Sequence, residues 1–178
     1  MKEIHILDKK FREYLTEKVI KQRIEELAIQ INNELSGKEV VFLGILNGAF
    51  LFAADLFRLI DFPARISFIK LASYQGTSSQ GLIKELIGWN EDIKGKTIVV
   101  VEDIVDTGNT LERIVDELVI RKAAEIKIAA LLYKPEAYTK NIPLDYVGFE
   151  IPNDFVVGYG LDYDGFGRNH SSVYTLID

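Results

Sequence analysis

Apolar positions in the first 38 residues recur at the spacing of a helix, with Lys, Arg and Glu between them. This pattern predicts an amphipathic helix that packs one face against the rest of the chain and ends at Ser36-Gly37-Lys38. Two further helices are predicted at about residues 49–59 and 109–121. The apolar positions of the first helix are Tyr14, Leu15, Val19, Ile20, Ile24, Leu27, Ala28 and Ile31.

Short, nearly uninterrupted apolar runs alternate with these helices. Residues 39–46 and 97–101 have the pattern of strands buried on both faces, which is typical of a parallel sheet. The second run, rich in Ile and Val, is the expected central strand. Further strands are predicted at 64–72, 126–133 and 146–149. The alternation predicts an α/β fold, in which helices flank a doubly wound, mainly parallel sheet.

The polar stretch 73–81 contains two glycines and no apolar residue that would anchor it. We expect a flexible hairpin lid here, with residues 82–88 as its returning strand. The tail from Glu150 to Asp178 carries no regular pattern. No linker or internal repeat interrupts the chain, so residues 1–178 are expected to form a single domain.

Composition narrows the function classes. With 21 basic and 27 acidic side chains, the formal net charge is −6, which argues against nucleic acid or an anionic membrane as partner. The absence of cysteine excludes disulfides, thiolate zinc sites and cysteine nucleophiles. The first eight residues are too charged for a signal peptide, and no apolar run reaches the ~18 residues of a membrane span. We therefore expect a cytoplasmic protein.

The candidate chemistry follows the central strand. Glu102 and Asp103 come directly after the apolar run, at the strand end where open α/β sheets bind their ligands. The segment Asp106-Thr107-Gly108-Asn109-Thr110 then opens a helix, where free backbone N–H groups, two hydroxyls and a glycine suit a phosphate. The spacing of a P-loop is absent.

An ordinary turn with a helix cap and solvated carboxylates is the alternative interpretation of this stretch. The convergence of several acidic and phosphate-type positions at one strand end favours a binding site. Paired carboxylates suit the hydroxyls of a sugar diol or a divalent cation.

The stretch resembles the phosphoribosyl-pyrophosphate (PRPP) signature of the type I phosphoribosyltransferases: an apolar strand, two acidic residues, two apolar residues and Asp-Thr-Gly-x-Thr. The likeness runs from the first buried strand to the chain end and is greatest to the hypoxanthine(-guanine) branch. It implies that Glu102 and Asp103 hold the ribose hydroxyls near Mg²⁺. It also implies that Asp106 is the catalytic base, and that Asp106 to Thr110 bind the 5-phosphate.

Three other segments match the family. Leu46-Asn47-Gly48 matches its pyrophosphate loop, which often contains a non-proline cis peptide; an ordinary tight turn is nearly as compatible with these residues. The family commonly has a basic residue where Asn47 stands, so the backbone is the implied contact. Ser73 and Tyr74 match the start of the lid, although a solvated hairpin tip has the same composition. Lys134 matches the lysine that reads the purine 6-oxo group, whereas a lone lysine at a strand end is usually only solvated.

The segment from Glu150 to Tyr163 resembles the purine-specific branch. Phe155 would stack on the base, with core packing as its alternative, and Val156 would offer backbone groups. Asp162, on the same side, would join Glu102 and Asp103 as a metal ligand, and Arg168 would contact pyrophosphate. Asp154 stands where some relatives carry lysine. The resemblance also implies a small hood, built from the N-terminal segment and residues 150–178.

The activity implied is Mg²⁺-dependent transfer of the 5-phosphoribosyl group from PRPP to N9 of hypoxanthine, and also of guanine, in purine salvage. A homodimer or homotetramer is expected. Two alternatives stay open: a sibling enzyme specific for xanthine or a pyrimidine, and a PRPP-sensing regulator that binds RNA or controls transcription. The net charge argues against the basic face that the regulator needs.

Overall fold

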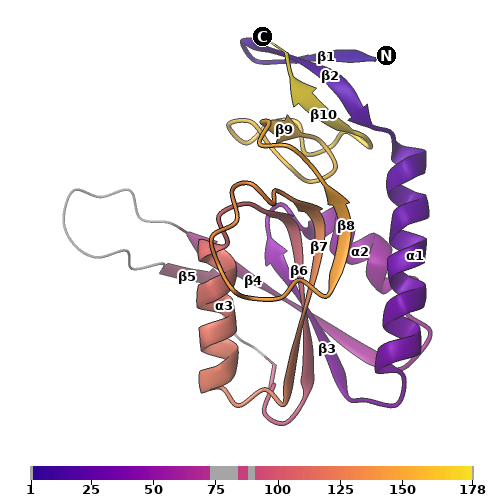
Figure 1. The fold of residues 1–178 in the computed structure, drawn as a ribbon, viewed down its shortest axis with the longest axis vertical. Coiled ribbons are helices and arrows are strands. Elements are labelled where there is room, and N and C mark those ends of the chain that lie inside the picture. Colours follow the sequence, from indigo (N-terminus) through magenta and orange to yellow (C-terminus); the bar gives the residue numbers. More distant parts are fainter. Residues whose placement is uncertain (1, 73–83, 88–90, 178) are drawn as a thin grey trace, which may run out of the picture.

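The computed structural model describes residues 2–72, 84–87 and 91–177, and Figure 1 shows their arrangement. The described helices are α1 (Glu17–Leu35), α2 (Phe50–Phe57) and α3 (Asn109–Ile120). The described strands are β1 (Glu3–Ile6), β2 (Lys9–Leu15), β3 (Val40–Leu46), β4 (Ala64–Ala72), β5 (Lys84–Ile87), β6 (Thr97–Val105), β7 (Glu125–Tyr133), β8 (Tyr146–Glu150), β9 (Val156–Val157) and β10 (Val173–Leu176).

The main sheet has six strands in the order β5-β4-β3-β6-β7-β8. Five of them are parallel, and β5 pairs antiparallel with β4. Helices α1 and α2 lie on one side of this sheet and α3 on the other (Figure 1). The predicted doubly wound α/β fold is therefore confirmed. The strand order reverses between β3 and β6, and a crevice for ligands is expected at the carboxyl ends of these two strands.

Strand β3 shows why the sheet is stable. Val40 and Phe42 pack into the core beneath α1 and α2, whereas Val41 and Leu43 pack into the core beneath α3. All four are almost completely buried. Burial on both faces is what the uninterrupted apolar run predicted, and burying such side chains contributes roughly 1.5 to 3 kcal/mol each.

The N-terminal prediction was wrong in its first part. Tyr14 and Leu15, assigned to the first helix, lie in strand β2, and α1 begins only after Thr16, whose hydroxyl caps it by accepting from the Val19 N–H. Strand β2 pairs on one side with β1 and on the other with β10, a strand from the far end of the chain. A partner so distant in sequence leaves no local signal, and it overrides the helical spacing.

These terminal strands form a four-stranded antiparallel sheet in the order β1-β2-β10-β9, which we call the hood. Its own small core contains Ile6, Phe11, Val157 and Tyr174. The hood sits above the carboxyl ends of the main sheet's strands, and β1 and β10 place both ends of the chain in it (Figure 1). The irregular tail of the sequence thus supplies two of its four strands.

Two boundaries near the expected site also differ from the sequence prediction. Strand β6 continues to Val105, because β7 pairs with Ile104 and Val105. Glu102 and Asp103 therefore lie within the carboxyl-terminal part of the strand rather than after it. The predicted lid, with Ser73 and Tyr74, lies outside the described residues, and β5 covers part of its predicted returning strand. No helix in the described ranges is long and apolar enough to cross a bilayer.

Helix α1 is fastened to β8, an edge strand of the main sheet. Arg23 donates from Nε to the Gly148 carbonyl oxygen and from Nη2 to the Val147 carbonyl oxygen, both at 2.9 Å. Its remaining nitrogen, Nη1, lies 2.6 Å from Glu26 in an exposed i,i+3 pair. The guanidinium thereby ties α1 to the backbone of an edge strand by two charge-assisted hydrogen bonds.

We predict that Arg23→Ala lowers the free energy of unfolding by about 1 to 3 kcal/mol, because two charge-assisted hydrogen bonds to β8 are lost. Glu26→Ala is the matched control, since it removes only the exposed ion pair, and it is expected to cost less than about 0.5 kcal/mol. Urea unfolding at one fixed protein concentration measures both. Equal losses would contradict the role given to the bonds with β8.

Candidate active site

Two segments meet at the reversal point of the sheet. The first follows β3 and consists of Leu46, Asn47 and Gly48, with a cis peptide bond between Leu46 and Asn47. The second is the acidic end of β6. The two are in direct contact, because a Cβ added to Gly48 would collide with the Asp103 carboxylate. The sequence placed these segments 55 residues apart on separate strands, and the fold brings them together.

The acidic pair on β6 lies in an environment that opposes ionisation. Burial raises the pKa of Glu102 well above the ordinary value for glutamate, and the neighbouring Asp103 raises it further. Burial also raises the pKa of Asp103 to about 6, against hydrogen bonds from the backbone of Ile104 and Asp103 that lower it. Among the described residues, Glu102 Oε2 is the buried side-chain oxygen that has no hydrogen-bond partner. Buried polar atoms are normally paired, so this oxygen points to a missing donor or cation.

The donor set fits a magnesium ion only if the substrate supplies part of the shell. Carboxylate oxygens are suitable ligands, and Glu102 and Asp103 are adjacent. Within the described residues, however, no three His, Cys, Asp or Glu side chains are grouped closely enough to hold a metal by themselves. Mg²⁺ commonly binds proteins through one or two carboxylates together with phosphate oxygens and water.

The predicted phosphate loop encloses a small cavity at the start of α3. Residues Asp106 to Leu111 line it together with Glu102, Ile104 and Val105. Gly108 is the N-cap residue, with a φ of 84°, and the Asn109 N–H donates to Thr107 Oγ1 at 3.4 Å. The other backbone N–H groups of the first turn and the positive end of the helix dipole are available to an anion.

A segment that sequence reasoning missed supports this loop. The ring of Tyr138 and the side chain of Lys140 pack so closely on Gly108 that a Cβ there would collide with both. Thr139 donates from its backbone N and from Oγ1 to the Thr107 carbonyl oxygen, at 3.3 and 3.2 Å. In the sequence these residues follow a strand as an ordinary loop, so only the close packing identifies them.

Asp106 and Lys134 form an ion pair across the carboxyl ends of β6 and β7. Their Oδ2 and Nζ atoms are 3.3 Å apart. The lysine side chain is only 10% exposed, whereas the aspartate is 47% exposed. The predicted alternative of a merely solvated lysine is therefore not what the structure shows. A buried ammonium that faces a carboxylate is fixed in position at the site.

On the hood side, Asp162 and Arg168 are paired with each other. Arg168 Nη2 lies 2.7 Å from Asp162 Oδ1, and the Gly165 N–H donates to Asp162 Oδ2 at 2.7 Å. Both charges act on Asp103 of β6: Arg168 lowers the pKa of Asp103, and Asp162 raises it. The structure thus brings Asp162 and Arg168 toward the acidic pair.

Phe155 and Val156, the two residues expected to contact the base, differ in exposure. Phe155 is 46% exposed and its ring contacts Phe11 and Tyr163, so it is not a core residue. The side chain of Val156 is buried and its backbone pairs with Thr175 of β10. Contact of either residue with a base stays a prediction.

Comparison with known proteins agrees with this geometry. A family model described as the phosphoribosyl transferase domain matches residues 11–164. A hypoxanthine-guanine phosphoribosyltransferase of Aquifex aeolicus is 42% identical over 180 residues, covering all of both chains. A hypoxanthine phosphoribosyltransferase of Salmonella typhimurium is 43% identical over 84% of this chain and 85% of its own.

Solved structures show the same likeness. The crystal structure of a hypoxanthine phosphoribosyltransferase from Staphylococcus aureus superposes with a TM-score of 0.88 at 38% identity, covering 93% of this chain and 91% of the other. A family match over most of the chain, full-length relatives and a common fold agree with the acidic strand and phosphate loop described above. This chain therefore belongs to the phosphoribosyl transferase family.

Proposed function

We propose that this protein is a purine-salvage enzyme that transfers the 5-phosphoribosyl group from PRPP to N9 of hypoxanthine, and also of guanine, releasing pyrophosphate. The observation that carries the proposal is the junction at the sheet reversal. There the buried pair Glu102–Asp103, the phosphate loop from Asp106 and the backbone at Gly48 come together. The relatives named above, which are similar over most or all of their length, support it.

Different residues of the site would bind different parts of PRPP. The Asp106 to Thr110 loop would bind the 5-phosphate with backbone N–H groups at the start of α3. Glu102 and Asp103 would accept hydrogen bonds from the two ribose hydroxyls, which would give the buried Glu102 Oε2 the donor it lacks. The backbone at Asn47 and Gly48, with Arg168, would bind pyrophosphate. Ser73 and Tyr74 are proposed as the start of the lid.

In the reaction, the bond from ribose C1 to pyrophosphate oxygen breaks and the bond from C1 to N9 forms. The purine loses the proton on N7, and Asp106 would accept it. Holding the reactants in line supplies much of the rate enhancement. Positive charge develops on the ribose before the new bond is complete. Lys134 Nζ lies 3.3 Å from Asp106 Oδ2 and helps to hold this carboxylate in place.

Lys134 would also select the base. An ammonium group only donates hydrogen bonds, so it pairs with a 6-oxo group and leaves a desolvated charge facing a 6-amino group. The low exposure of Lys134 makes this mismatch costly. Phe155 would stack on the base, Val156 would contribute backbone groups, and Asp162 would lie on the purine side.

Glu102, Asp103 and Asp162 are proposed to hold Mg²⁺ together with the substrate. When bound, the ion would neutralise charge on the departing pyrophosphate. The expected homo-oligomer, the cytoplasmic location and the absence of nucleic-acid and membrane partners stay predictions.

The proposed activity predicts a simple base profile. With PRPP and Mg²⁺, hypoxanthine and guanine are expected to react, and adenine and uracil to react at least about 100-fold more slowly in kcat/KM. Adenine leaves the buried charge of Lys134 facing a 6-amino group, and uracil lacks the ring that carries N9 and the N7 proton. Steady-state assays with these four bases and xanthine measure it. A preference for xanthine or uracil would identify a sibling enzyme. PRPP binding without any transfer would identify a regulator.

Asp106→Asn tests the catalytic base. The amide cannot take up a proton, so kcat with hypoxanthine is expected to fall roughly 10² to 10⁴-fold, with KM for PRPP changed little. Asp116→Asn is the matched control, because Asp116 is exposed on the same helix and has no proposed role. Unchanged turnover in Asp106→Asn would remove Asp106 as the base.

Asp103→Asn tests whether the Asp103 carboxylate lowers the stability of the ligand-free fold while it contributes to the binding of Mg²⁺–PRPP. A carboxyl whose pKa rises to about 6 on folding stabilises the fold below about pH 4, and this contribution is lost as pH rises through 6. At pH 8 the wild type therefore carries a penalty of up to about 3 kcal/mol, which asparagine avoids. We predict that the ligand-free variant is more stable than wild type at pH 8, by less at pH 5, and binds Mg²⁺–PRPP more weakly.

Urea unfolding at the two pH values and titration calorimetry with Mg²⁺ and PRPP measure these effects. Asp116→Asn, an exposed position on α3, changes the net charge equally and is expected to leave both unchanged. A destabilised Asp103→Asn at pH 8 would contradict the account of the buried pair.

A further inference from the structure

Tyr159 occupies an unusual position in the hood. It is almost fully buried in the core beneath α1 and α2 and adopts a left-handed backbone conformation, with φ of 48°. Gly158 and Gly160 on either side also have positive φ values, of 94° and 99°. Such a conformation costs a residue with a side chain, so its surroundings must hold it in place.

The hydroxyl of Tyr159 reaches out of the hood to helix α2. It donates to Asp55 Oδ2 at 2.6 Å. Burial and this bond to Asp55 both raise the pKa of Tyr159, so the phenol remains a donor at neutral pH. A short hydrogen bond to a carboxylate is among the stronger single contacts a protein makes.

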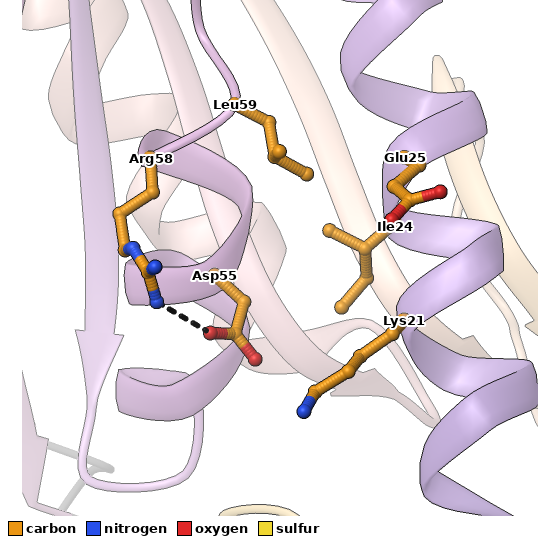
Figure 2. A pocket seen from close by; sticks show the side chains of 6 residues that line it. All are labelled: Lys21, Ile24, Glu25, Asp55, Arg58 and Leu59. Carbon is orange, nitrogen blue, oxygen red and sulfur yellow. Dashed lines mark ion pairs between the residues drawn. The ribbon is translucent and has the colours of Figure 1, made fainter.

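The other oxygen of Asp55 faces a surface pocket between α1 and α2. Figure 2 shows the Asp55 carboxylate between Arg58 of the α2 end and Lys21 of α1. Arg58 Nη1 lies 3.8 Å from Asp55 Oδ1, and the arginine side chain is 81% exposed. An ion pair that long and that exposed contributes little. The bond to Tyr159 is therefore the main interaction of this carboxylate.

The loop that Tyr159 anchors reaches the pyrophosphate side of the site. A Cβ added to Gly160 would collide with the Gly48 carbonyl oxygen, so the two backbones are in contact. The Gly160 carbonyl accepts from Arg168 Nη1 at 2.7 Å, and the Gly160 N–H donates to the Arg168 carbonyl at 3.0 Å. Arg168 in turn pairs with Asp162.

Helix α2 starts two residues after Gly48. Asp55 and the proposed pyrophosphate loop are consequently carried by one short continuous segment, and Tyr159, Gly160 and Arg168 by another. The two segments meet twice: at Gly48 with Gly160, and at Asp55 with the side chain of the neighbouring Tyr159. The first segment is therefore held at both of its ends by one short stretch of the second.

We propose that Tyr159 is a positioning residue, which through Asp55 holds Gly160 and Arg168 in register with the backbone of Gly48 for binding pyrophosphate and PRPP. The inference rests on the proposed function for the identity of the ligand. It assigns Tyr159 and Asp55 no contact with substrate. On the base side, Lys134 is attached to β7 and lies outside this link, whereas Phe155 and Val156 directly precede the Tyr159 loop.

Tyr159→Phe removes the hydroxyl and keeps the buried ring. KM for PRPP and the Kd of Mg²⁺–pyrophosphate are expected to rise about 5- to 20-fold, because the loss of one charge-assisted hydrogen bond reaches the ligand through the loop. KM for hypoxanthine is expected to rise less than KM for PRPP, because Lys134 at the end of β7 is untouched. Asp55→Ala should match this effect, and Asp55→Asn, which keeps an acceptor oxygen, should recover most of the wild-type KM.

Arg58→Ala is the matched control, since it removes the other partner of Asp55 and is expected to leave both constants unchanged. The double variant Tyr159→Phe/Asp55→Ala should be no worse than either single variant, as expected for two groups of one interaction. Fully additive losses, or equal rises in KM for PRPP and hypoxanthine, would overturn the proposal.

Hydrogen exchange of the ligand-free protein supplies a readout that does not depend on activity. In Tyr159→Phe, the amides of Gly160 and His170 are expected to exchange at least about tenfold faster, and amides of β6 at the wild-type rate. Unchanged exchange in the loop would refute the positioning role even if the enzyme were inactive. Faster exchange in a protein that ignores PRPP and pyrophosphate would instead refute the proposed function and leave the link intact.

Discussion

The close approach of three segments at Gly48 is the constraint on which the site depends. Gly48 lies against the Asp103 carboxylate and, through its carbonyl oxygen, against Gly160 in the loop after β9. A side chain at position 160 would collide with the Gly48 backbone, and one at position 48 would displace the Asp103 carboxylate. The acidic strand, the loop after β3 and the loop after β9 are therefore assembled around these two glycines.

The electrostatics of the site oppose the stability of the fold. Two neighbouring carboxyl groups on β6 are partly buried, and one of their oxygens, which is fully buried, has no partner within the described part of the chain. Such a pair is unfavourable until a cation or hydroxyl donors arrive. The large apolar core on the two faces of the sheet offsets the cost of these carboxyl groups. Val99 and Val101, on the same strand, are almost completely buried in it. Ligand binding and relief of the buried charge are then one event.

The sequence predicted best where local pattern and burial agree. The buried runs at β3 and β6 identified the parallel sheet, and the Asp106 to Thr110 segment identified the start of α3, because both signals are complete within a few residues. The hood was missed as a sheet, since its centre is the pairing of β2 with β10, from opposite ends of the chain. The bond between Tyr159 and Asp55 was missed because its two residues are also far apart in the sequence. The roles implied by resemblance for Phe155 and the lid stay predictions.

The pairing of β2 with β10 also governs the order of assembly during translation. Phe11, which the finished hood buries, emerges from the ribosome with only the β1–β2 hairpin around it. The stretch from Leu15 to Val173 takes roughly 10 to 30 s to synthesise, and only then can β10 close the sheet. A nascent chain that stalls before this point leaves one edge of β2 unpaired and Phe11 without its cover from β10.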